Sequence, residues 1–168
     1  METEAEKPRP SGRGVVTILS GETIRCLAII SPHVSPGVFG GMSYGESLAG
    51  YDIRVAKTVR VFVFFTSLAV SLERFDIPTN VCGGLHDKST WARRGLSVFN
   101  TILEPGWRGW LTVEMTYKPR LRHFWKLWIT IPKGTPIGQV VFERVDKNTS
   151  GYNGKYQNQP QRPIDAIF

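Results

Sequence analysis

Residues 59–70 read VRVFVFFTSLAV, a run of β-branched and aromatic side chains that decides the fold class. Such residues are enriched in strands because they pack well on a pleated, half-buried surface, so we expect buried strands here. Working outward, Gly- and Pro-containing turns separate further predicted strands, which lie at 51–56, from Leu72 onward, and at 81–86, 96–101, 110–117, 124–131 and 137–145. This spacing is typical of a β-barrel or jelly roll.

A short helix is predicted near the start of the strand-rich region. In LSGETIRCLAI, residues 19–29, Ser20 precedes Ile24, Leu27 and Ala28 at helical spacing. A Ser in that position is a preferred N-cap, because its hydroxyl accepts a hydrogen bond from a free backbone N–H of the first turn.

Length and charge restrict the classes of protein that fit. The chain has 168 residues, enough for one domain with its own core, and a formal net charge of +7. Such a surface attracts polyanions, namely nucleotides, nucleic acid or an acidic membrane. The basic residues form no unbroken tract, the nearest being KPRLRHFWK at 118–126, so we expect no disordered nucleic-acid arm.

The cysteines and the termini indicate the compartment and the domain limits. Cys26 and Cys82 are too few for a disulfide framework and no CxxC spacing occurs, which favours a reducing compartment. The N-terminal METEAEKPRPSGRG has no apolar signal region, and nowhere do 18 apolar residues run together. We therefore expect a cytoplasmic protein with no membrane partner. Its predicted parts are a flexible tail at 1–14, a β domain at 15–145 and a polar tail at 146–168 that is either disordered or a lid over a ligand.

The stretch DKSTWARRG, residues 87–95, surrounds one Trp with five side chains that bind anions: Lys88, Ser89, Thr90, Arg93 and Arg94. One interpretation is purely structural. Ser89 would cap a single helical turn, Gly95 would end it in the left-handed conformation, and the charges would form a solvated face.

The strand WLTVEMTY, residues 110–117, carries the most informative carboxylate. The period-two pleat sends Leu111, Val113 and Met115 to one face and Glu114 to the other, in the middle of the strand. From this strand alone, Glu114 is also compatible with an ordinary solvent-facing side chain.

Four segments together resemble the deoxycytidine triphosphate (dCTP) deaminase family, which shares its fold with the trimeric dUTPases. The central segment is HDKSTWARRGLSVFNTILEPGWRGWLTVE, residues 86–114. Three outlying segments occur in the family's order: SYGESLAGYDIRVA at 43–56, PIGQVVFERV at 136–145 and GKYQNQ at 154–159. The resemblance implies a mainly β protomer, a distorted jelly-roll or β-barrel of the dUTPase-like type with short helices, in a homotrimer whose active sites lie between neighbouring subunits.

The resemblance also implies a catalytic set. Glu114 matches the family's catalytic carboxylate, and Ser89 and Arg93 match positions beside the cytosine and the attacking water. Deamination needs a water activated for attack on C4, a proton for N3 and a proton for departing ammonia. One carboxylate can meet all three needs by accepting and donating protons. Zinc deaminases use HxE and PCxxC motifs that this sequence lacks, so we expect no zinc; Mg²⁺ would arrive with the triphosphate.

Further positions match substrate contacts of the family. Lys88 and Thr90 match phosphate-binding positions, and Glu104 matches a contact to the deoxyribose. The base would be framed by Asn100, Thr101 and Ile102, and the tail residues closing over the phosphates would be Tyr152, Lys155, Tyr156 and Gln159. Arg94 matches no role and is expected at the surface.

These matches predict metal-independent hydrolytic deamination of dCTP to dUTP and ammonia, with a deoxycytidine nucleotide and a second and third copy of the chain as partners. Alternatives on the same site are a deaminase acting on dCMP or 5-substituted dCTP, and a bifunctional enzyme that gives dUMP. From another class, a catalytically inactive nucleotide-binding regulator is compatible with the motifs. The Arg/aromatic mixture at 118–128 is compatible with single-stranded nucleic acid, but we favour a strand with snorkelling cations.

Overall fold

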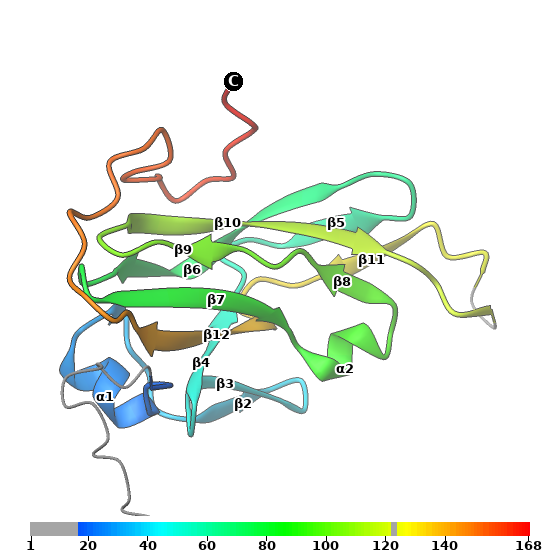
Figure 1. Cartoon of the computed structure of the whole chain (residues 1–168). Coiled ribbons are helices and arrows are strands. Elements are labelled where there is room, and N and C mark those ends of the chain that lie inside the picture. Colours follow the sequence, from blue (N-terminus) through cyan, green and yellow to red (C-terminus); the bar gives the residue numbers. More distant parts are fainter. Residues whose placement is uncertain (1–16, 122–123) are drawn as a thin grey trace, which may run out of the picture.

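The computed structural model describes residues 17–121 and 124–168, and within them the chain is mainly β with two short helices (Figure 1). Antiparallel pairing forms a four-stranded sheet in the order β1-β6-β10-β8, a six-stranded sheet in the order β2-β3-β4-β12-β7-β9, and the pair β11-β5. The elements are α1 Gly21–Cys26, β1 Ile30–Ser31, β2 Gly37–Phe39, β3 Met42–Ser47, β4 Gly50–Arg54, β5 Val59–Phe62, β6 Ser67–Asp76, β7 Val81–Asp87, α2 Ser89–Ala92, β8 Leu96–Val98, β9 Ile102–Leu103, β10 Arg108–Tyr117, β11 Trp128–Ile131 and β12 Pro136–Arg144.

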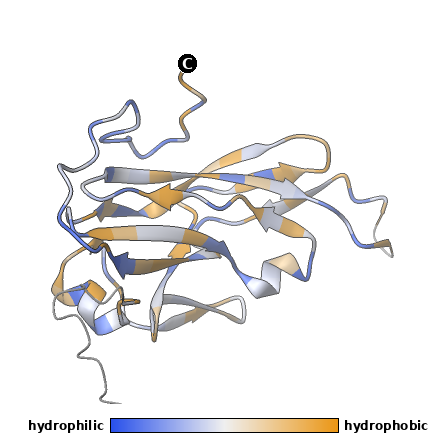
Figure 2. Cartoon of the chain, viewed as in Figure 1, coloured by the Kyte–Doolittle hydropathy of each residue, from blue (hydrophilic) through white to orange (hydrophobic). Residues whose placement is uncertain are grey.

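The core lies between the two larger sheets, and the strands of both sheets carry hydrophobic residues (Figure 2). Phe75 on β6 and Phe142 on β12 are both fully buried, and their ring centroids lie 6.4 Å apart across this interior. The prediction of a mainly β fold is therefore confirmed. A closed barrel is not, because the strand pairing among the described residues gives open sheets with free outer strands.

Helix α1 forms where its sequence signal predicted it. The Ser20 hydroxyl accepts a hydrogen bond from the backbone N–H of Thr23 at 3.2 Å, and Ile24 is fully buried beneath the helix. The predicted N-cap is confirmed.

The run at 59–70 is not one stretch of buried strand. Strand β5 ends at Phe62 and β6 begins at Ser67, so the turn falls inside the run and the predicted strand start at Leu72 is wrong. Phe64 and Phe65 at this turn are 81% and 68% exposed. Composition favoured buried strand here because it does not distinguish an aromatic side chain in the core from one at the tip of a hairpin.

The predicted strands at 51–56, 81–86, 110–117 and 137–145 are confirmed within a few residues. The predicted strand at 124–131 begins only at Trp128, the one at 96–101 ends at Val98, and the short β9 was not predicted. Among the described residues, no helix has the length and apolar character needed to cross a membrane.

The C-terminal tail folds back onto β10 (Figure 1, orange to red). The backbone N–H of Asn158 donates to the carbonyl of Arg108 at 2.8 Å, and the N–H of Trp110 donates to the carbonyl of Gln159 at 3.1 Å. Gly109 permits this approach, because a Cβ there would lie 2.6 Å from the nitrogen of Gln159. The predicted tail at 1–14 lies outside the described residues.

A buried ion pair joins the two sheets. Glu73 on β6 is fully buried, and its carboxylate accepts hydrogen bonds from Nε of Arg54 at 2.7 Å and from the Arg54 backbone N–H at 3.0 Å. Burial raises the pKa of Glu73 despite this partner. Burial also raises the pKa of the neighbouring Tyr51 to about 12, with a smaller contribution from the charge of Glu73.

Candidate active site

Glu114 occupies the position that the strand pleat predicted. Leu111, Val113 and Met115 belong to the core, whereas Glu114 is half-buried on the other face of β10. Its Oε2 atom is buried and accepts no hydrogen bond from any of the described residues. Native structures rarely leave a buried carboxylate oxygen without a partner, so this atom is a candidate contact for a ligand or a reacting group.

The cavity next to Glu114 has a volume of about 360 Å³. The structure brings seven of the predicted site residues together in its wall: Glu114, Thr101, Ile102, Glu104, Tyr152, Tyr156 and Gln159. They come from β10, the β8–β9 region and the tail, segments far apart in the sequence. The wall also contains residues that sequence reasoning did not propose: Leu68, Leu103, Trp107, Leu111, Thr112, Ile164, Asp165 and Ala166.

Thr112 anchors the tail beside Glu114. Its backbone N–H and its hydroxyl both donate to Oε1 of Gln159, at 3.3 and 3.2 Å, and its hydroxyl accepts from the backbone N–H of Ile164 at 3.1 Å. Because Oε1 of Gln159 faces Thr112, the NH₂ group of the same amide points away from Thr112. The sequence did contain a signal for Thr112, because the strand pleat places it on the same face as Glu114. No sequence pattern pointed to Ile164 or Asp165.

The other tail residues pack on one another over this cavity. The indole N–H of Trp107 donates to the carbonyl of Tyr156 at 2.7 Å, and the Tyr156 hydroxyl accepts from the N–H of Ile167. Lys155 is exposed and lines neither this cavity nor the groove described below; its ammonium donates to the carbonyl of Ile167 and lies 5.5 Å from the centroid of the Tyr156 ring.

Helix α2 carries the second group of predicted residues. The proposed Ser89 cap is wrong: Lys88 is the N-cap residue, Ser89 is the first helical residue, and no side chain caps the helix. Gly95 ends the turn with φ of +92°, as predicted. The indole N–H of Trp91 donates to the carbonyl of Pro136 at 2.7 Å in the protein interior, which fixes α2 against β12.

The α2 residues do not join the Glu114 cavity within one chain. Lys88 is paired with Asp52 at 2.7 Å and donates to the hydroxyl of Ser43 at 3.1 Å. Ser89 is exposed, while Thr90 and Arg93 line a separate groove of about 950 Å³. Asn100 is exposed and lines neither hollow.

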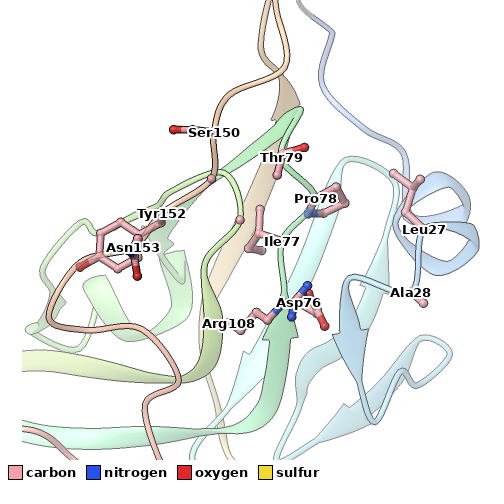
Figure 3. Close-up of a pocket in the computed structure, with 12 residues that line it drawn as sticks. Leu27, Ala28, Asp76, Ile77, Pro78, Thr79, Arg108, Ser150, Tyr152 and Asn153 are labelled. Carbon is pink, nitrogen blue, oxygen red and sulfur yellow. The ribbon is translucent and has the colours of Figure 1, made fainter.

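A third hollow of about 660 Å³ lies between the tail and the β6–β7 turn (Figure 3). Of the predicted site residues only Tyr152 lines it, and its two charged residues, Asp76 and Arg108, pair with each other at 2.8 Å. This hollow therefore offers no unpaired cation for a nucleotide in its wall.

The described residues include no cluster of three or more His, Cys, Asp or Glu side chains placed to hold a metal ion. Cys26 and Cys82 are free thiols, and burial raises the pKa of Cys82.

Comparison with known proteins agrees with the arrangement of these motifs. The model of the dCTP deaminase-like family matches residues 65–145. The dCTP deaminase of Roseiflexus castenholzii is 35% identical over 182 aligned residues, which cover 86% of this chain and 96% of that protein. The chain belongs to the dCTP deaminase family. The dCTP deaminase of Herpetosiphon aurantiacus, 32% identical over 78% of this chain and 86% of its own, is a further relative in this family of enzymes.

Solved structures support the same fold. The 2′-deoxycytidine 5′-triphosphate deaminase of Agrobacterium tumefaciens superposes with a TM-score of 0.61 at 14% identity, over 79% of this chain and 49% of that one, so the chain spans about half its length. The dUTPase of Staphylococcus bacteriophage 80alpha superposes with a TM-score of 0.52 at 16% identity, over 90% and 94%. The predicted family membership, and with it the assignment to an enzyme family with a dUTPase-like fold, is confirmed.

Proposed function

We propose that this protein deaminates dCTP hydrolytically, giving dUTP and ammonia, with Glu114 as the catalytic carboxylate. The single observation that carries the proposal is the buried Oε2 of Glu114, which has no hydrogen-bond partner among the described residues and belongs to the wall of a cavity in a member of the dCTP deaminase family. Thr101, Glu104 and Gln159 line the same cavity and would contact the base, the deoxyribose and the phosphates of the nucleotide, respectively.

Glu114 would transfer two protons in turn. It takes a proton from water as the oxygen attacks C4 of the cytosine, and it delivers that proton to N3, forming a tetrahedral intermediate. It then takes the proton of the new hydroxyl and gives it to the amino group as the C4–N bond breaks, so that ammonia leaves and the uracil carbonyl forms. Mg²⁺ would enter with the phosphates as part of the substrate.

The position of α2 supports a site shared between subunits of a homotrimer. Ser89 and Arg93 are exposed and lie away from the Glu114 cavity of their own chain. On the surface of a neighbouring copy, the same two side chains would complete that cavity and supply fixed donors to the developing oxyanion. Such donors contribute about 3–4 kcal/mol each in enzymes where they have been removed.

The test compares Glu114→Gln with Glu143→Gln, a matched change at another half-buried carboxylate on β12. Each protein is incubated with Mg²⁺ and, separately, dCTP, dCMP, 5-methyl-dCTP and dUTP, and ammonia and nucleotide products are measured. We expect wild type and Glu143→Gln to convert dCTP to dUTP, and Glu114→Gln to be slower by roughly 10²–10⁴-fold.

Other product patterns identify the alternatives. Reaction of only dCMP or the methylated nucleotide keeps the mechanism and changes the substrate, and dUMP with pyrophosphate reveals a bifunctional enzyme. Nucleotide binding without any reaction indicates a regulator. Wild-type turnover by Glu114→Gln would exclude the proposed mechanism.

A further inference from the structure

The groove beside α2 has a second wall, which the family resemblance does not explain. Of its lining residues, Thr90, Trp91, Arg93 and Arg94 belong to the α2 segment. The opposite wall is the segment between β10 and β11 together with β11 itself, and it contributes Arg120 and residues 125–130. We call the described residues of this connection, 118–121 and 124–127, the arm.

Charge in this groove has one sign. The lining residues include four cations, Arg93, Arg94, Arg120 and Lys126, and no carboxylate. All four are exposed, and none forms an ion pair with the described residues. The sequence between Glu114 and Glu143 contains no Asp or Glu, so the arm brings no acidic residue of its own to neutralise them. A groove of this kind binds an anion of high charge.

Aromatic rings lie among these cations. Trp125 and Trp128 line the groove and are 62% and 47% exposed. Exposed rings bind the planar faces of bases, and guanidinium and ammonium groups bind phosphate oxygens. Cations and rings in one groove of about 950 Å³ therefore fit a nucleotide carrying several phosphates.

We propose that the arm is the second wall of the nucleotide site, and that Arg120 and Lys126 bind the polyphosphate of the substrate. The inference rests on the proposed function, because it takes Thr90 and Arg93 on the first wall as substrate contacts. Its consequence is a choice of substrate: two cations beyond those of α2 favour a nucleoside triphosphate over a monophosphate, which carries about two negative charges. The arm thus selects dCTP over dCMP.

The test removes the two charges and compares two substrates. In Arg120→Gln/Lys126→Gln, we expect KM for dCTP to rise by roughly tenfold or more per lost contact, KM for dCMP to change far less, and kcat to stay within about twofold. The control Lys57→Gln/Lys133→Gln loses the same charge from two exposed positions outside the groove and keeps wild-type values. Arg120→Lys/Lys126→Arg, which keeps both charges, should recover most of the affinity. Equal KM values for wild type and the double glutamine variant would overturn the proposal.

A binding measurement separates this proposal from the proposed function. The dissociation constant of inorganic tripolyphosphate is measured by calorimetry for wild type, the double glutamine variant and its control. Weaker binding by the double variant alone supports the arm as a phosphate site even if no cytosine nucleotide is deaminated. If tripolyphosphate binding is unchanged, or a single-stranded oligonucleotide binds more tightly and is lost in the double variant, the groove serves another ligand and the assignment fails.

Discussion

Glu114 and Arg93 line different hollows of the same subunit. Both are proposed catalytic residues, so a complete site on one chain would require a rearrangement of β10 or α2. Trp91, bound to the carbonyl of Pro136, opposes such a movement of α2. In the proposed homotrimer, a neighbouring copy would bring the two residues together without any change in fold.

The first prediction is complementation between inactive variants. We expect Glu114→Gln and Arg93→Ala each to be inactive as homogeneous proteins. When subunits are mixed in equal amounts, unfolded and refolded together, about a quarter of the interfaces pair a wild-type Glu114 with a wild-type Arg93. Ammonia release should then return to about a quarter of the wild-type rate. No recovery, with mixed oligomers demonstrated by mass spectrometry, would place both residues in a site within one subunit.

The second prediction concerns the tail. Gln159→Ala removes the acceptor for both the N–H and the hydroxyl of Thr112, and each lost bond weakens docking by about 1 kcal/mol. Protease cleavage after residue 150 should become several-fold faster, and KM for dCTP should rise. Arg162→Ala, at an exposed tail position three residues away, serves as the control and should leave both values near wild type. Unchanged cleavage in Gln159→Ala would mean that other contacts hold the tail.

The third prediction separates backbone strain from steric clash. Gly95 has φ of +92°, and a Cβ there would lie 1.9 Å from the backbone oxygen of Lys118. Gly134 has φ of +80° with nothing within 4 Å of such a Cβ. We expect Gly134→Ala to lower the free energy of unfolding by about 1 kcal/mol and Gly95→Ala by several times more, measured by urea denaturation. Equal losses would show that the chain near Lys118 relaxes freely.

The fourth prediction uses the raised pKa of Glu73, which burial causes. The folded protein binds the Glu73 proton more tightly than the unfolded chain does. This difference stabilises the folded state fully below about pH 4.3, and the contribution is lost as pH rises through the pKa of Glu73 in the folded protein. Relative to Glu73→Gln, which does not titrate, wild type should lose stability over that range. Unfolding free energies from pH 4 to 8 give the comparison. A difference that grows with pH would mean that pairing with Arg54 outweighs burial.

Sequence reasoning succeeded where a local pattern determines the structure. The alternation of WLTVEMTY placed Glu114 opposite the core, and Ser20 marked the start of α1, because both depend on neighbouring residues. It failed where contacts between segments far apart in the sequence determine the position of a side chain. Lys88 pairs with Asp52, 36 positions earlier, and Ile164 reaches Thr112, 52 positions before it. No local pattern records such contacts.

The candidate site shows the same division. Seven residues of the Glu114 cavity were named from family motifs, but their separation from α2 became visible only in three dimensions. Phe64 and Phe65 illustrate the limit of composition, since the same aromatic run supplies both β5 and an exposed turn.

Strand β10 carries Glu114 and also provides the backbone edge to which Asn158 and Gln159 bond. The tail is thus attached to the strand that carries the proposed catalytic Glu114, a few residues before that glutamate. A nucleotide that enters or leaves past the tail would do so only after these hydrogen bonds between the tail and β10 break. The rate of the slowest step of the catalytic cycle would then depend on how long the pairing between the tail and β10 lasts. The turnover number would rise or fall with the opening rate of a few backbone hydrogen bonds.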